Sequence, residues 1–128
     1  MKTSSDPIKN LNWKESFSVA MKGFSFAFAQ EASVRRAVIS ALILIGITLA
    51  MGAGFIESLV VIIMWTQVVI FELFNTSVEK VLDYTCEHKF HPLVKYSKDT
   101  LAAAVFVCSL LGSLIFIAIL VRHIVGIL

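Results

Sequence analysis

The sequence has few of the charged residues that cover the surface of a water-soluble domain. Only 16% of its 128 residues are charged, while 58% are hydrophobic. A soluble domain of this size needs more polar surface, so the composition indicates a single membrane-embedded domain. The net charge is only +2, and the basic residues are spread along the chain, so we expect no binding to nucleic acid.

Cysteine and the common catalytic motifs are equally scarce. The two cysteines, Cys86 and Cys108, lie far apart, and Cys108 falls inside an apolar run, so we expect free thiols and no disulfide framework. The phosphate-binding pattern GxxxxGK(S/T), the nucleophile-elbow motif and the Cys/His spacing of a zinc site are all absent. His88 and His91 are interpreted as loop residues, not as zinc ligands.

What the sequence does contain is three long apolar stretches. We predict transmembrane helices at residues 35–56, 58–83 and 98–121, because about 20 apolar residues cross the ~30 Å hydrocarbon core as a helix. The second of these helices is expected to extend into the cytoplasm. The uncharged part of the middle stretch, 58–71, is too short by itself. It spans only if the helix continues through Glu72. The sequence thus predicts an all-α membrane protein.

Basic residues are distributed unevenly around these stretches. Six lie in residues 1–36 and four in residues 80–98, whereas residues 37–79 contain none. Since basic residues gather on the cytoplasmic side of membrane proteins, we predict that the N-terminus and residues 72–99 are cytoplasmic.

Residues 13–30 have the pattern of an amphipathic helix. Apolar residues recur at helical spacing from Trp13 to Phe28, and lysines and serines occupy the other side. We predict a helix lying in the membrane interface ahead of the first span; packing on the protein's own cytoplasmic part is the alternative. Residues 1–12 are expected to be flexible, and residues 84–95 to form a cytoplasmic loop broken by Pro92.

Small residues recur at every fourth position in the first and third spans, a spacing that lets membrane helices approach closely. Chance in a stretch rich in Ala and Gly is the alternative. Three helices with little soluble mass would enclose a poor site alone, so we expect a homo-oligomer. The small residues are Gly46, Ala50, Gly54, Ala104, Cys108 and Gly112.

The stretch VVIFELFNTSVEKVLD, residues 68–83, places polar side chains on one face of the middle helix. At about 100° per residue, Glu72, Asn75, Glu79 and Asp83 fall within a narrow sector. The other two spans bring charged residues to the same depth, namely Glu31 and Arg35 in the first and Lys98 and Asp99 in the third.

So many acids at one depth repel one another unless basic groups or a cation compensate them. Mg²⁺ is the natural candidate, because it binds carboxylate oxygens and keeps coordination sites for phosphate. Polar residues at membrane depth are functional by default. Simple anchoring in the headgroup zone is the alternative, and we prefer it for the basic residues Arg36, Lys80, Lys89 and Lys95.

Two blocks of the sequence resemble a known family. ELFNTSVEKVLD (72–83) followed by HPLVKYSKDTLAAAV (91–105) resembles the small prokaryotic diacylglycerol kinases and undecaprenol kinases. MKGFSFAFAQEASVRR (21–36) is similar to the surface helix of that family and to the Glu-x-x-x-Arg pair at its first span. The resemblance implies a homotrimer in the bacterial inner membrane with its active site on the cytoplasmic side. It also implies transfer of the γ-phosphate of ATP to a lipid hydroxyl with Mg²⁺.

The resemblance further implies roles for individual residues. Glu72 takes the position of the general base, where the lipid hydroxyl would arrive, and Glu31 and Glu79 take the metal-binding positions. This fits phosphoryl transfer, in which positioning and charge neutralisation supply most of the rate. The implied ATP-binding residues are Lys22, Glu31, Asn75, Glu79, Asp83, His91, Lys98 and Asp99, and the implied lipid-binding residues are Arg35 and Glu72.

The sequence departs from the family pattern at several positions. Ala37 stands where relatives often carry Glu or His, and Ala102 replaces a serine of the diacylglycerol-preferring members. Asn12, Glu15 and Val19 replace basic or aromatic residues used around the nucleotide. The HPLVK block is more similar to the undecaprenol kinases.

Two other functions stay open at this point: a non-enzymatic oligomer of the ion-conducting or holin-like kind, and an inactive member of the family. The outer halves of the helices lack ionisable groups that would line a conduction path, which favours the kinase. The lipid itself stays undecided, because apolar helix surfaces accept diacyl and polyprenyl chains alike.

Overall fold

The structure is a computed structural model that describes residues 11–127. Within these residues lie four helices and no strand, so the predicted all-α fold is confirmed. Of the segment predicted to be flexible, 1–12, residues 1–10 lie outside the described range. The helices are α1 (Trp13–Gln30), α2 (Ala32–Ala50), α3 (Phe55–Thr85) and α4 (Pro92–Ile127).

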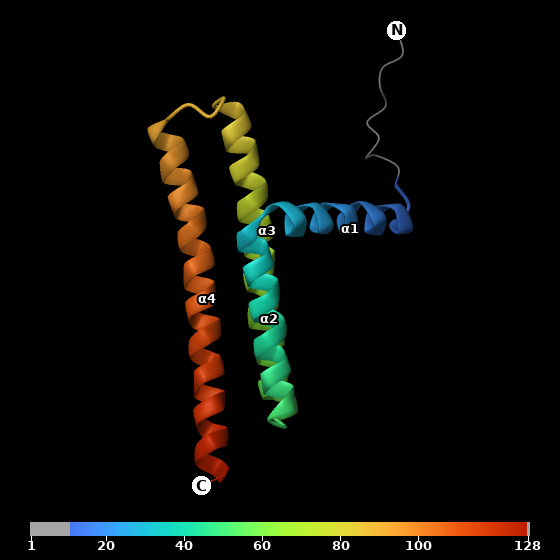
Figure 1. The fold of residues 1–128 in the computed structure, drawn as a ribbon, viewed down its shortest axis with the longest axis vertical. Coiled ribbons are helices and arrows are strands. Elements are labelled where there is room, and N and C mark those ends of the chain that lie inside the picture. The colour runs from blue at the N-terminus through green and yellow to red at the C-terminus, as the bar shows by residue number, and fades with distance from the viewer. Residues whose placement is uncertain (1–10, 128) are drawn as a thin grey trace.

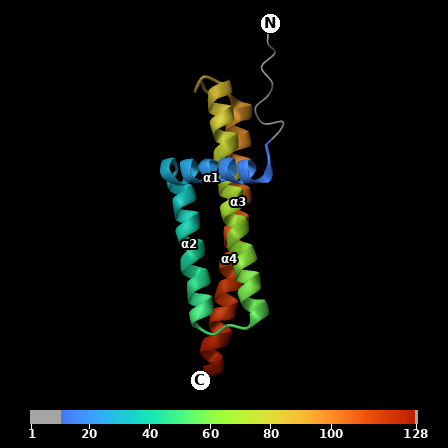
Figure 2. The same ribbon diagram turned by 90° about the vertical axis from the view of Figure 1, so that its right-hand side faces the viewer.

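Helices α2, α3 and α4 run alongside one another, and α1 lies across their direction and projects to one side (Figure 1). Each of the three is long and apolar enough to cross a membrane, as expected for a multi-pass membrane protein. α3 contacts both α2 and α4 along much of its length, whereas α2 and α4 touch each other little (Figure 2). The polar ends of α3 and α4 extend beyond the level of α1 (Figure 1).

The buried core is small and lies along α3. Its residues are Ala37 and Ala41 of α2, Val61, Trp65 and Val68 of α3, and Cys108 and Phe116 of α4. Most other large apolar side chains are exposed in the single chain. Exposed apolar surface on this scale is typical of helices that face lipid or another subunit.

The first turn of α1 explains two of the departures from the family pattern. The Asn12 side chain accepts a hydrogen bond from the Glu15 backbone N–H at 3.0 Å, and the Glu15 carboxylate accepts one from the Asn12 N–H at 2.9 Å. This reciprocal capping box satisfies backbone donors that would otherwise lack partners at the helix start. Asn12 and Glu15 therefore cap the N-terminus of α1.

The end of the bundle opposite α1 carries an ion pair between α3 and α4. The Glu57 carboxylate accepts a hydrogen bond from the Gly54 N–H at 3.0 Å and lies 2.7 Å from the Arg122 guanidinium. The Glu57 side chain is 18% exposed. The prediction that the outer halves of the helices lack ionisable groups is therefore wrong. Glu57 and Arg122 lie at this end and form an ion pair with each other.

The turn between α3 and α4 is shorter than the predicted loop 84–95. α3 continues to Thr85 and α4 already begins at Pro92. Proline is favoured at a first helical position, where its missing N–H costs nothing. Backbone bonds within residues 83–91 and positive φ angles at Glu87 (51°) and His88 (59°) close the turn.

The small residues of the two outer spans have different surroundings. On α4, Gly112 lies against the Trp65 ring, and Cys108 is buried in the core. On α2, a Cβ added to Gly46 would meet nothing within 4 Å. Close packing inside the chain therefore uses Cys108 and Gly112 of α4, whereas Ala104 is exposed and Gly46 of α2 has no close neighbour.

Candidate active site

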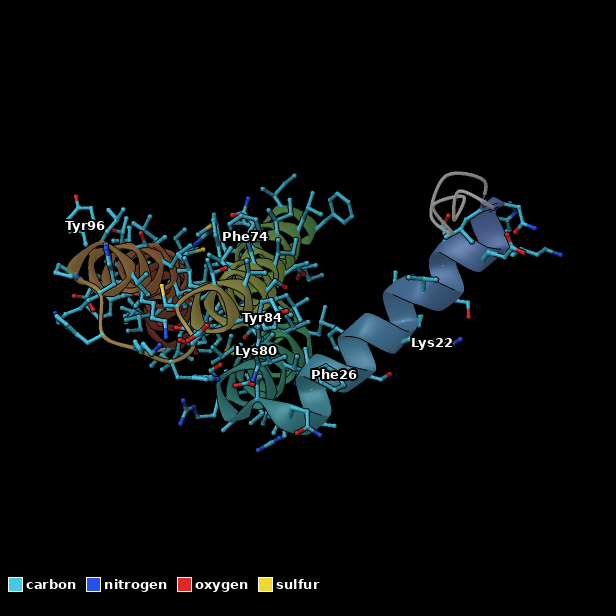
Figure 3. The ribbon with its side chains drawn as sticks, turned by 90° about the horizontal axis from the view of Figure 1, so that it is seen from above. Lys22, Phe26, Phe74, Lys80, Tyr84 and Tyr96 are labelled. Atoms are coloured by element: carbon cyan, nitrogen blue, oxygen red, sulfur yellow. The ribbon has the colours of Figure 1, made fainter. Side chains whose placement is uncertain are left out.

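Charged side chains gather where α3 and α4 pass the corner between α1 and α2. Figure 3 looks down on this end and shows Lys80 beside the corner, near Phe26 at the end of α1. Two ion pairs are found here, Glu31 with Lys80 and Asp83 with Lys98, and a further carboxylate, Glu79, is near both lysines. We call this group the charge cluster; it consists of Glu31, Glu79, Lys80, Asp83 and Lys98.

Glu31 occupies the corner itself. It is the one non-helical residue between α1 and α2, with φ −112° and ψ 116°. Arg35, one turn into α2, holds this corner, because its guanidinium donates to the carbonyls of Phe28 at 3.0 Å and Ala29 at 2.8 Å. These two carbonyl groups belong to the last turn of α1, where backbone carbonyls have no hydrogen-bond partner inside the helix. Arg35 thus fixes where the Glu31 side chain emerges, while its implied contact with substrate stays a prediction.

The Glu31 carboxylate is paired with Lys80 of α3, with 2.6 Å between Nζ and Oε1. This contact raises the pKa of Lys80. Sequence reasoning assigned Lys80 only an anchoring role and missed the pairing. Thr76, four residues earlier and therefore on the same side of α3, is buried. No sequence pattern shows which helix covers that side.

The second ion pair joins α3 to α4. The Lys98 ammonium donates a hydrogen bond to the Asp83 carboxylate, and both side chains lie beyond the uncharged stretches of their helices. The hydrogen bond lowers the pKa of Asp83 and raises the pKa of Lys98. Glu79 makes no ion pair with another described residue, yet its charge acts on both Lys80 and Lys98. Its carboxylate is therefore near both lysines.

A cavity of about 450 Å³ opens beside Lys98, and we call it the loop cavity. Its volume falls in the range of small-molecule sites. Four of the residues that the resemblance assigns to ATP line it: Asp83, His91, Lys98 and Asp99. His91 also caps α4, because its Nδ1 accepts a hydrogen bond from the Leu93 N–H at 3.2 Å. Asp99 is paired with Lys95 at 2.8 Å. The remaining lining residues are Cys86, His88, Lys89, Phe90, Val94 and Lys95.

Glu72 lines a separate and smaller cavity of about 240 Å³, which we call the Glu72 cavity. No described residue lines both cavities. Glu72 lies seven residues before Glu79, which is about 10 Å along the helix axis. The other lining residues are Ser33, Arg36, Ala37 and Ser40 of α2, Trp65 and Val68 of α3, and Ser109 of α4. Arg36, like Lys80, was interpreted only as an anchor, and its place at this cavity was missed.

Asn75 lies between Glu72 and Glu79 on α3. Its Oδ1 atom is buried and has no hydrogen-bond partner among the described residues. A buried acceptor without a partner is unfavourable, so it is typical of a position that a cation or a donor fills on binding. The implied nucleotide contact of Asn75 stays a prediction.

The arrangement suits magnesium only together with a phosphate ligand. Among residues 11–127, no group of three or more His, Cys, Asp or Glu side chains lies close enough to hold a metal. Mg²⁺ bound with a nucleotide needs only one or two carboxylates, because phosphate oxygens and water complete its shell. Glu31 and Glu79 are carboxylates that could hold such an ion together with a nucleotide, and in this structure Glu31 is paired with Lys80.

Lys22 lies apart from the charge cluster in the single chain. It is on the part of α1 that projects from the bundle (Figure 3). A shallow groove runs beside it, lined by Phe17, Ser18, Met21, Lys22 and Ser25. The chain on its own does not bring Lys22 to the other residues assigned to ATP.

Comparison with known proteins identifies the family. The model of the prokaryotic diacylglycerol kinase family matches residues 18–120. A diacylglycerol kinase of Helicobacter pylori strain 26695 is 34% identical over 94 residues, which are 73% of this chain and 73% of that one. A diacylglycerol kinase of H. pylori strain J99 is 37% identical over 82 residues, 64% of this chain and 63% of the other. One from Synechocystis is 32% identical over 95 residues, 74% of this chain and 54% of the other. The chain belongs to the prokaryotic diacylglycerol kinase family, and this membership supports a lipid kinase.

Proposed function

We propose that the protein transfers the γ-phosphate of ATP to the hydroxyl of a membrane lipid, either diacylglycerol or undecaprenol. The observation that carries the proposal is the single stripe of α3 that holds Glu72, Asn75, Glu79 and Asp83. Glu72 lines the Glu72 cavity at one end of the stripe, and Asp83 lines the loop cavity at the other. Diacylglycerol is the substrate in the printed names of the relatives. Undecaprenol is the alternative that the HPLVK block favours.

In this proposal the loop cavity receives the nucleotide. Lys98 donates to phosphate oxygens, and His91 and Asp99 contact the rest of the nucleotide. Glu31 and Glu79, with the Asn75 oxygen, would hold Mg²⁺, and the bound ion would supply neutralisation of the charge on the transferred phosphoryl group. Lys80 keeps Glu31 paired until the nucleotide arrives.

Glu72 accepts the proton of the lipid hydroxyl in the same proposal. Its place at the end of the uncharged stretch 58–71 suits a hydroxyl that arrives from the bilayer while the hydrocarbon chains stay among the apolar helix faces. The distance of about 10 Å between Glu72 and Glu79 leaves room for the phosphate chain between base and metal.

The proposal places this site on the cytoplasmic side of the bacterial inner membrane, following the distribution of basic residues. It also includes a homotrimer. α1 projects from the bundle and exposes Trp13, Phe17 and Phe26, so a neighbouring copy is within its reach. In a trimer, Lys22 would then complete the nucleotide site of that neighbour.

The test is transfer of labelled γ-phosphate to each lipid in mixed micelles, with and without Mg²⁺. We expect transfer by the wild type and a loss of at least about 10³-fold in Glu72→Gln, since the base is removed while size is kept. Glu57→Gln is the matched control, the same change on the same helix at the opposite end, and it should retain activity. Full activity of Glu72→Gln would refute the assigned base, and no transfer by the wild type to either lipid would indicate an inactive member of the family.

A further inference from the structure

Another cavity opens at the end of the bundle opposite α1, beside the ion pair of Glu57 and Arg122, and we call it the end cavity. Its volume of about 380 Å³ falls in the range of small-molecule sites. α4 continues past the turn between α2 and α3 at this end (Figures 1 and 2), and its last turns form one wall of the cavity. The family model stops at residue 120, so this wall lies outside the matched part of the chain. The lining residues are Gly54, Glu57, Arg122, His123 and Gly126.

The last turns of α4 have one polar side and one apolar side. At about 100° per residue, Arg122, His123 and Gly126 share one side of the helix, and all three line the end cavity. Exposed apolar surface of this kind on a membrane helix is typical of contact with lipid chains. The end cavity therefore joins a polar wall to an apolar surface, as the binding of a phospholipid requires. The exposed apolar residues opposite the wall are Val121, Ile124 and Val125.

The Glu57 carboxylate is fixed in the end cavity by two hydrogen bonds. Oε2 accepts from the Gly54 N–H at 3.0 Å, and Oε1 accepts from Arg122 Nη1 at 2.7 Å. Each carboxylate oxygen can accept a further hydrogen bond, so Glu57 keeps room for a donor from a ligand. Its fixed position gives the site a defined negative end.

Arg122 supplies the positive end. The bond to Glu57 is its one hydrogen bond to another residue of the described range 11–127, and its side chain is 79% exposed. A guanidinium has five N–H donors in a planar fork, which suits a phosphate. Most of these donors are therefore available, while Glu57 holds the guanidinium at the mouth of the cavity.

His123 adds a second acceptor to the wall. Its Nδ1 lies 3.2 Å from the carbonyl oxygen of Ile119. Because a carbonyl only accepts, a hydrogen bond here places the hydrogen on Nδ1, and Nε2 of the neutral ring is then an acceptor. The space beside Gly126 is open, since a Cβ added there would meet nothing within 4 Å.

These groups match one class of lipid headgroup. With Glu57 negative, Arg122 positive and His123 neutral, the lining has no net charge, so a zwitterionic headgroup keeps the balance and an anionic one adds an uncompensated charge. Phosphoethanolamine carries a phosphate for the guanidinium and a primary ammonium whose N–H groups donate to the carboxylate and the imidazole. Phosphocholine has the same charges, but its quaternary ammonium has no N–H to donate.

We propose that the end cavity binds the headgroup of an ethanolamine phospholipid. The phosphate binds Arg122, the ammonium binds Glu57 and His123, and the acyl chains lie along the apolar side of α4. No described residue of the end cavity also lines the loop cavity or the Glu72 cavity. The bound phospholipid is thus separate from the proposed substrate, and the site does not depend on the proposed phosphate transfer.

The experiment is native mass spectrometry of the detergent-solubilised protein with equal amounts of phosphatidylethanolamine, phosphatidylcholine and phosphatidylglycerol of the same acyl chains. We expect the wild type to retain about tenfold more of the ethanolamine lipid than of either other lipid, the size of one charge-assisted hydrogen bond. Arg122→Ala should lose this preference. Arg36→Ala, the same change at an exposed arginine on α2, should keep it. Equal retention of the three lipids by the wild type, or a preference that survives Arg122→Ala, would overturn the proposal.

A second variant tests the charge balance without removing the phosphate-binding group. Glu57→Gln keeps the size of the side chain and leaves the lining with a net positive charge, so the preferred lipid should change from phosphatidylethanolamine to phosphatidylglycerol. An unchanged preference in Glu57→Gln would refute the contact between Glu57 and the ammonium. If Arg122→Ala alters the oligomeric mass and leaves lipid retention as it was, the cavity is a contact between copies of the chain and the proposal is rejected.

Discussion

The Nζ atom of Lys80 lies 2.6 Å from the Oε1 atom of Glu31, and this contact ties the middle of the chain to the corner between α1 and α2. Glu31 has both backbone dihedrals outside the helical range, so its carboxylate turns towards α3. Glu79 and Asp83 flank the same lysine on α3 and act on its charge. Lys80 therefore interacts with both Glu31 and Glu79, the two carboxylates proposed to bind magnesium.

Removal of the Lys80 charge should strengthen magnesium binding. Lys80→Met frees the Glu31 oxygen and removes a positive charge next to the proposed ion, so we expect half-maximal phosphate transfer at a Mg²⁺ concentration about three- to tenfold lower. The measurement is a Mg²⁺ titration of the transfer reaction at saturating ATP. Lys14→Met removes the same charge on the projecting part of α1 and should leave the titration unchanged. An unaltered Mg²⁺ requirement in Lys80→Met would argue against Glu31 as a ligand.

Lys98 should affect the nucleotide and not the lipid. Lys98→Ala removes a charged donor from the loop cavity, so we expect the KM for ATP to rise about tenfold or more while the KM for the lipid changes little. Asp83→Asn leaves the ammonium in place and should cost less. Steady-state kinetics with each substrate varied in turn separates the two effects. A change in the lipid KM alone would place Lys98 outside the nucleotide site.

Arg35 should stabilise the corner between α1 and α2. Arg35→Ala removes both hydrogen bonds to the carbonyls of Phe28 and Ala29, and we expect a loss of about 1–2 kcal/mol in the free energy of unfolding. Cleavage by a protease near residues 28–32 should become faster as the corner opens. Arg36→Ala, at the adjacent position, should leave the cleavage rate as it is. Equal cleavage of all three proteins would mean that the corner is held by other contacts.

The Glu57–Arg122 pair should contribute to stability without affecting phosphate transfer. Because Arg122 is 79% exposed and solvent screens it, we expect Arg122→Ala to cost only about 0.5–1 kcal/mol. The exchange Glu57→Arg with Arg122→Glu should recover part of the loss. Unfolding by denaturing detergent gives the free energies, and the transfer assay gives the activity. A large loss of activity with intact folding would connect this end of the bundle to the reaction.

The sequence predicted the elements of this fold better than their contacts. Periodicity placed the first helix at 13–30, the bounds that α1 has, because apolar residues there follow one helix face. The last two helices extend further than predicted, because hydropathy detects where the apolar stretch ends and not where the helix ends. α3 continues as a polar helix to Thr85, and α4 starts with polar turns from Pro92.

The candidate site was predicted in part, and the missed residues share one physical cause. The stripe of Glu72, Asn75 and Glu79 follows from the helical period alone. The places of Lys80 and Arg36 depend instead on how α3 lies against α2, and a sequence pattern does not contain that register. Family resemblance drew attention to Ala37 as a missing polar group, yet the structure puts Arg36, its neighbour, at the same cavity.

The separation of the two cavities on α3 has a kinetic consequence for the proposed reaction. In the proposed reaction the nucleotide would arrive and leave through water by way of the turn at residues 86–91, while the lipid would diffuse sideways from the bilayer to Glu72. Neither molecule blocks the path of the other, so no compulsory order of addition is imposed. Initial-rate plots should intersect, and product inhibition by ADP should be competitive against ATP alone, as in a random ternary-complex mechanism.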